Sequence, residues 1–207
     1  MTTDERSRPL PDEPMSVRLM NTIGADRGGL HDDLAEPSQV ADWLAAVELH
    51  PGTRVTRDEW RAARRLRDAL RRAAGHATHD TRPAAASPVL DIAEAVEVIN
   101  ERRADLPAER LAVHSSAFRR ERGTAASPVM AALAVVSADA IDLLTTPGAP
   151  ALGACTAPGC VLYFVKHHPR REWCSTACGN RARAARHYRR HRPSDVAPQP
   201  PASSPAE

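Results

Sequence analysis

The four cysteines of the chain lie together near its C-terminus, as C-x4-C and C-x3-C pairs joined by 13 residues (Cys155, Cys160, Cys174 and Cys178). Two close pairs with a short connector have the spacing of a tetrahedral zinc site with four thiolate ligands. The alternative is disulfides, but we expect no signal peptide and no apolar run long enough to cross a bilayer, hence a reducing, cytoplasmic setting. We therefore predict one structural zinc ion, and no membrane contact.

Basic residues are concentrated around these cysteines. Residues 155–192 carry a net charge of +8, whereas residues 1–154 carry −4. A small basic module on a mildly acidic body predicts a polyanion partner for the module alone. A solvated surface in an arginine-rich protein is the alternative, and the residues do not separate DNA from RNA. The predicted nucleic-acid contacts are Lys166, Arg170, Arg171, Arg181, Arg183, Arg186, Arg189 and Arg190.

The second cysteine pair opens a basic helix, predicted from Ser175 to about Arg192. At about 100° per residue, its packed side would hold Ala177, Ala184, Tyr188 and His191, opposite Arg183, Arg186 and Arg190. Upstream, residues 161–165 and 171–173 read as the two strands of a hairpin. Knuckle, hairpin and helix in this order predict a treble-clef or zinc-ribbon-like module.

Helical patterns dominate the part before the module, which predicts a mainly α fold. The expected helices cover residues 37–49, 56–74, 87–103 and 127–144, with the following start and stop residues: Ser38 as N-cap, Thr56 and Glu59 as capping box, Gly75 at the C-terminal stop and Pro88 in a first turn. Residues 106–118 are ambiguous and are compatible with short strands. The predicted organisation is a disordered leader (1–14), a helical domain (15–145), a hinge (146–151), the zinc module (152–192) and a disordered tail (193–207).

The tetrapeptide Cys178-Gly179-Asn180-Arg181 spells CGNR and is followed by a run of arginines. With the upstream C-x4-C, it closely resembles the CGNR zinc finger family. The N-terminal part is similar to ABATE, the domain that usually precedes this finger, through Leu19-Met20-Asn21-Thr22, Asp33-Leu34 and the stretch from Val40 to Leu44. Met20 departs from the aromatic or aliphatic residue usual before Asn-Thr. The resemblance implies double-stranded DNA as partner and transcription regulation in a stress response, in a bacterial cytoplasm and on its nucleoid.

Several residues allow two interpretations. Asn180 could bond the knuckle or a cysteine sulfur from just outside the metal site, and Gly179 could permit close approach of the helix. Asn21 and Thr22 could line a pocket for an effector, or form a buried polar pair that caps a helix. We find no motif of a known catalytic site and predict that the protein is not an enzyme.

The helical domain is expected to sense an effector or to form a homodimer. Two other functions stay open: a zinc-stabilised protein-interaction module, and a small-molecule-binding helical domain carrying an RNA-binding finger.

Overall fold

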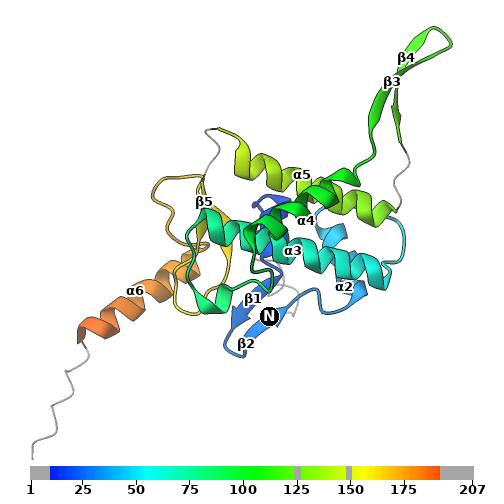
Figure 1. Ribbon diagram of the computed structural model, residues 1–207. Helices are drawn as coiled ribbons and strands as arrows, with labels where there is room; N and C mark the ends of the chain where they lie inside the picture. Colours follow the sequence, from blue (N-terminus) through cyan, green and yellow to red (C-terminus); the bar gives the residue numbers. More distant parts are fainter. Residues whose placement is uncertain (1–9, 124–126, 148–150, 192–207) are drawn as a thin grey trace, which may run out of the picture.

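The computed structural model describes residues 10–123, 127–147 and 151–191. Most of the predicted leader (residues 1–14) and all of the predicted tail (residues 193–207) lie outside these ranges. The fold is mainly α, as predicted, with three short hairpins (Figure 1). The elements, in chain order, are α1 (Met15–Met20), β1 (Ile23–Asp26), β2 (Gly29–Asp32), α2 (Pro37–Ala46), α3 (Arg57–Ala77), the short 3-10 helix η2 (Pro83–Ala85), α4 (Ile92–Ala104), β3 (Glu109–His114), β4 (Ala117–Arg122), α5 (Pro128–Thr145), β5 (Leu152–Ala154), β6 (Tyr163–Val165) and α6 (Thr176–His191).

Helix α3 is the centre of the helical domain and packs against α1, α2, α4 and α5. It begins where the capping box predicts, because the Thr56 hydroxyl accepts from the Glu59 backbone N–H while the Glu59 carboxylate accepts from Thr56. The helix was expected to end before Gly75, but it continues to Ala77. The end is set by Thr78, whose hydroxyl donates to the Ala74 carbonyl.

Two details of the other predicted helix starts are wrong, the N-cap of α2 and the first residue of α4, whereas α2 itself starts at residue 37 as expected. Helix α2 is capped by Glu36 rather than by Ser38, because Pro37 takes the first turn and Gln39 completes a capping box with Glu36. Helix α4 starts only at Ile92, after an Asp91 cap, rather than near Pro88. At α4 the Asp91 side chain, which accepts from the Ala93 N–H, replaces the predicted start at Ser87 and Pro88.

Helix α5 begins as predicted, with the Ser127 hydroxyl accepting from the N–H groups of Val129 and Met130. Its 18 residues are long and apolar enough to cross a membrane by length and composition alone, which corrects the expectation that the chain has no such run. The helix packs against α1, α3 and α4 with Leu133 and Val136 fully buried, as a core helix does.

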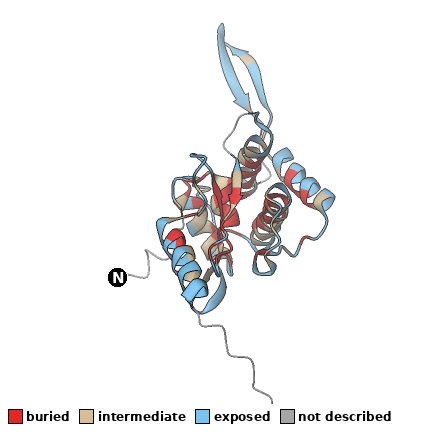
Figure 2. Ribbon diagram, turned by 90° about the vertical axis from the view of Figure 1, so that its left-hand side faces the viewer, coloured by how far each residue is buried: buried red, intermediate tan, exposed pale blue. Residues whose placement is uncertain are grey.

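The three hairpins are antiparallel and lie in different places. β1 pairs with β2, and β3 pairs with β4 over most of the region whose strand content the sequence left ambiguous. The β3–β4 hairpin stands away from the body of the molecule (Figure 1) and is exposed along its length (Figure 2). β5 pairs with β6, so that Leu152 lies opposite Val165.

The β5–β6 pairing corrects the predicted zinc module. Residues 161–165 were expected to pair with residues 171–173, but β6 pairs with the segment before the first cysteine instead. Tyr163 and Val165 are buried in the same core as the helices of the N-terminal domain. The chain between β6 and α6 turns at residues 167–170, as expected, but does not return as a strand.

Candidate metal centre

The four cysteine sulfurs converge on one point, with all four sulfurs within 4.8 Å of one another and all four residues buried. The Cys160 and Cys174 sulfurs are 3.8 Å apart and those of Cys174 and Cys178 are 3.4 Å apart. Four thiolates around a tetrahedral zinc ion, each about 2.3 Å from it, lie about 3.8 Å from one another. The cluster therefore fits a tetrahedral ion of this size with little rearrangement.

Local sequence explains how each pair is presented. Between the first two cysteines the chain folds back at Gly159, whose φ of 72° favours glycine, and the Cys160 N–H donates to the Ala157 carbonyl at 3.0 Å. The second pair spans the start of α6, where the Ser175 hydroxyl accepts from the Cys178 N–H at 3.3 Å. One pair thus comes from a tight turn and the other from a helix start.

The thiols influence one another strongly. Hydrogen bonds from Cys160 and Cys174 lower the pKa of Cys155 to about 2. Donation to Cys155 raises the pKa of Cys160 to about 12, and it also raises the pKa of Cys174. Four sulfurs this close cannot all be thiolates without a cation between them, because like charges disfavour further ionisation. A divalent ion that takes thiolate ligands would remove this conflict.

The helical domain holds the first cysteine pair through Arg82. One guanidinium nitrogen of Arg82 donates to the carbonyls of Cys155 and Cys160, at 2.6 and 2.8 Å. The other side of the group is paired with the carboxylate of Asp80, whose side chain is 4% exposed. Asp80 also accepts from the hydroxyl of Tyr163, at 2.9 Å. Burial and this contact raise the pKa of Tyr163 to about 12.

A second clamp holds the segment between β6 and the second cysteine pair. The Arg171 guanidinium donates to the carbonyls of Val165 and Cys174, at 2.8 and 2.9 Å, and pairs with Glu13 at 2.8 Å. The Glu13 carboxylate also accepts from the Val165 N–H. Glu13 was assigned to a disordered leader, but it is buried and joins the first residues of the described chain to the metal centre.

Comparison with known families agrees with this arrangement. Residues 13–147 match the ABATE model, described as "Putative stress-induced transcription regulator", and residues 151–191 match the CGNR zinc finger model. The chain belongs to the ABATE family. No curated protein gives a significant match. In this ABATE protein the match to the finger covers all four cysteines, and the finger match and the sulfur cluster together support zinc binding.

The CGNR tetrapeptide contacts the site differently from the prediction. Asn180 does not reach a sulfur; its side-chain oxygen accepts from Arg183 at 2.6 Å. Arg181 instead donates to the Cys178 sulfur, at 3.1 Å. A Cβ at Gly179 would lie 3.0 Å from the ring of Trp173, so the glycine permits close approach to this ring rather than to the knuckle.

The predicted face of α6 is also wrong. Ala177, Ala184, Tyr188 and His191 are exposed, and the packed side is formed by Cys178 and Gly179, with Ala182 and Ala185 partly covered. The rotation of the helix is fixed by Cys178, which must face the other three sulfurs. Periodicity of small apolar residues could not reveal this constraint, since alanines occur both on the predicted packed face and on the observed one.

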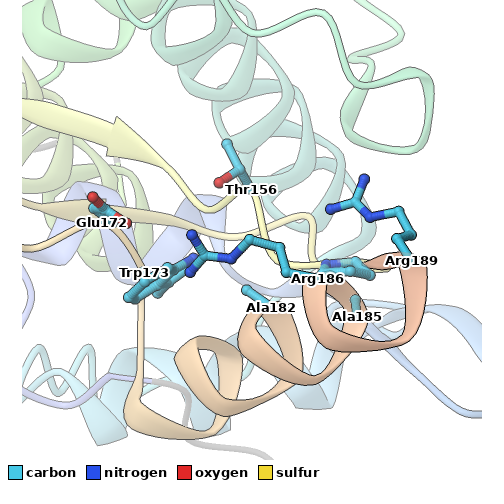
Figure 3. Close-up of a pocket in the computed structure, with 8 residues that line it drawn as sticks. Thr156, Glu172, Trp173, Ala182, Ala185, Arg186 and Arg189 are labelled. Atoms are coloured by element: carbon cyan, nitrogen blue, oxygen red, sulfur yellow. The ribbon is translucent and has the colours of Figure 1, made fainter. Parts of the chain in front are cut away.

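With this rotation, part of the arginine set borders a groove of about 450 Å³ beside α6. Figure 3 shows Trp173, Arg186 and Arg189 around this hollow, with Thr156 of the cysteine knuckle across it. The guanidinium carbons of Arg183 and Arg186 lie 5.6 and 5.9 Å from the Trp173 ring centre, within the range of cation–π contact. The groove combines an aromatic side, two arginines, a hydroxyl and the carboxylate of Glu172.

The other predicted contact residues divide into two groups. Lys166, Arg170, Arg189 and Arg190 are exposed. Arg171, in contrast, is occupied by the Glu13 clamp, and Arg181 is directed at a sulfur. The arginines available to a partner are therefore fewer than the charge count indicated.

Asn21 and Thr22 have structural partners. The Asn21 amide donates to the Tyr163 carbonyl and accepts from the Tyr163 N–H, both at 2.9 Å, as a neighbouring strand would. The Thr22 hydroxyl donates to the Leu19 carbonyl at the end of α1. Of the two interpretations of this pair, the structure favours the buried polar pair over the pocket.

Sequence reasoning missed Asp80, Arg82 and Glu13, which position the cysteines. Asp80 and Arg82 lie in what looked like a linker, and Glu13 in what looked like a leader. A carboxylate two residues before an arginine is too common in this arginine-rich chain to single out a site.

Proposed function

We propose that the protein is a zinc-dependent DNA-binding regulator, in which α6 and the turn before it contact duplex DNA. The observation that carries this proposal is the exposed arginine side of α6, next to the aromatic groove, on a module of net charge +8. Guanidinium groups pair with phosphates and with guanine edges, so both positioning and base contacts are open to them. The family description supports a regulatory, stress-related role.

Zinc would fix the direction of α6 rather than take part in a reaction. Cys155, Cys160, Cys174 and Cys178 would be its four ligands, which leaves no coordination position for water or substrate. We therefore propose that the protein acts by binding and not by catalysis. A cytoplasmic setting would keep the thiols reduced and available to the metal.

The proposal is tested by measuring binding to a fluorescently labelled duplex, by fluorescence anisotropy, at a series of salt concentrations. We expect log K to fall linearly with log salt, by about 0.9 per phosphate contact. Arg186→Ala and Arg189→Ala should each weaken binding and lower this slope by about one. Arg65→Ala, an exposed arginine on α3, is the matched control and should change neither. Absence of binding to any duplex at low salt, with zinc bound, would overturn the proposal.

A second candidate partner is an acidic protein segment. The groove beside α6 favours it, because Ala182, Ala185 and Pro158 give its lining apolar surface among the arginines. If this is the partner, a pull-down should survive nuclease treatment and should be lost in Arg186→Ala.

Anisotropy measured in parallel with single-stranded RNA distinguishes RNA from DNA as the nucleic acid bound.

A further inference from the structure

The protruding β3–β4 hairpin carries three large apolar side chains in solvent. Leu111, Val113 and Phe118 are 73%, 68% and 75% exposed. Val113 lies opposite Phe118 in the register, and Leu111 is two residues before Val113, so all three share one face of the hairpin. Exposed apolar clusters of this kind mark interaction sites more often than chance placements.

The hairpin is built as a stiff arm. Its turn consists of Ser115 and Ser116, both with positive φ (47° and 68°), which is the twist of a tight two-residue hairpin turn. Two ion pairs link the strands, Arg110 with Glu121 at 2.9 Å and Arg120 with Glu109 at 3.3 Å. A two-stranded hairpin alone is marginally stable in water, so a surface that covers the apolar face would stabilise it.

Helix α4 offers a surface of matching chemistry. A groove of about 560 Å³ lies along its outer side, with an apolar part and an acidic part, and it is lined by Ile92, Ala93, Val96, Glu97, Asn100 and Glu101. Within the described parts of the chain, neither glutamate has a basic partner. Residues 91–101 carry a net charge of −4, whereas the arm, residues 109–122, carries +2.

The arm does not cover the groove of its own chain. It leaves the molecule beyond the C-terminal end of α4 and points away from the body (Figure 1). The groove is open although the arm is present in the same chain. Within one chain the arm and the groove are thus apart, so an arm that filled this groove would come from a second copy.

We propose that two copies of this chain form a symmetric dimer in which the β3–β4 arm of each lies in the α4 groove of the other. The apolar face of the arm covers Ile92, Ala93 and Val96. Arg120, which lies opposite Leu111 on the same face, approaches Glu97 and Glu101. Two-fold symmetry makes each contact twice, so two arms and two grooves contribute to one closed interface. The dimer would place two copies of α6 at a fixed spacing.

Analytical ultracentrifugation of the full, zinc-loaded chain over a wide concentration range tests this. We expect the mass of two chains, and a dissociation constant raised at least about 100-fold in the double variant Val113→Ser, Phe118→Ser, since two apolar contacts are lost on each side. Leu30→Ser, at an exposed apolar position on β2, is the matched control and should remain a dimer. Circular dichroism checks that all variants keep their helices.

Charge reversal makes the test specific for the groove. Glu97→Arg with Glu101→Arg should weaken the dimer, as should Arg120→Glu, and the three changes in one chain should restore it. A wild-type monomer at every concentration, or serine variants that still dimerise, would overturn the proposal. It would also fail if the arm variants changed DNA affinity alone, which would make the arm a nucleic-acid contact.

Discussion

Within the zinc-binding region, β5 and β6 lie in the core of the helical domain, whereas α6 extends into solvent (Figures 1 and 2). Tyr163 and Val165 are buried and bonded to Asn21 and Glu13. In α6, only Cys178 and Gly179 are buried. The first half is therefore part of the body, and the second half depends on the cysteines for its attachment.

Each half supplies one cysteine pair, and this explains the use of a metal at this position. Cys155 and Cys160 flank the turn between β5 and β6, and Cys174 and Cys178 start α6. An ion bound by all four cysteines would join the β5–β6 segment, which is fixed in the core, to a helix that has little packing of its own. The basic residues can then stay in solvent instead of being buried for stability.

The largest expected effect comes from zinc removal. We expect chelation to speed amide hydrogen exchange in α6 by at least about 1,000-fold, because a 16-residue helix without its link is marginal in water. Exchange in β5 and β6 should remain slow, since the helical domain holds them. Cys178→Ser should give the same pattern without a chelator. Equal loss of protection in both halves would contradict the comparison.

A smaller effect is expected at Arg82, through which the helical domain binds the first cysteine pair. Arg82→Ala leaves the buried Asp80 carboxylate without its charged partner, so the free energy of unfolding should fall by about 3 kcal/mol in a denaturant titration. Zinc affinity should fall about 10–100-fold in a competition assay, because the carbonyls of Cys155 and Cys160 lose their donor. Arg61→Ala removes an exposed pair and should cost under about 0.5 kcal/mol. Unchanged zinc affinity in Arg82→Ala would show that the hydrogen bonds from Arg82 to the cysteine carbonyls do not position the metal ligands.

The smallest expected effect is the loss of the stability contributed by the Asp80 carboxylate at low pH. Burial raises the pKa of Asp80, but hydrogen bonds from Arg82 and Tyr163 outweigh it and lower the pKa below 3.8. Because the folded pKa is the lower one, the carboxylate stabilises the fold above pH 3.8, and this stabilisation is lost as the pH falls through the folded value. Asp80→Asn should therefore cost about 2 kcal/mol at neutral pH and progressively less in acid.

Unfolding of both proteins by denaturant across the pH range measures this difference, with Asp58→Asn as an exposed control. A gap between wild type and Asp80→Asn that stays constant in acid would contradict the assigned ionisation.

Features set by neighbours in the chain were predictable. The Thr56–Glu59 capping box, the Ser127 cap and the cysteine pairs all depend on residues a few positions apart, and all appear as expected. The mainly α fold follows from the same local patterns.

Features set by distant contacts were not predictable. The partner of β6 is chosen by the core, and the rotation of α6 by Cys178. Arg82 and Arg171 have the same sequence context as many other arginines, and only the tertiary structure brings them to cysteine carbonyls. Charge counting likewise could not separate arginines that clamp the fold from those that face solvent.

The contacts of Glu13 and Asn21 bear on how the chain folds during synthesis. Asn21 bonds Tyr163, 142 residues away, and Glu13 bonds Val165, 152 residues away. Contacts of such long range form late, since the intervening chain must first be ordered. In a nascent chain the side chains of Glu13 and Asn21, on either side of α1, would thus bond water until the segment with Tyr163 and Val165 emerged from the ribosome.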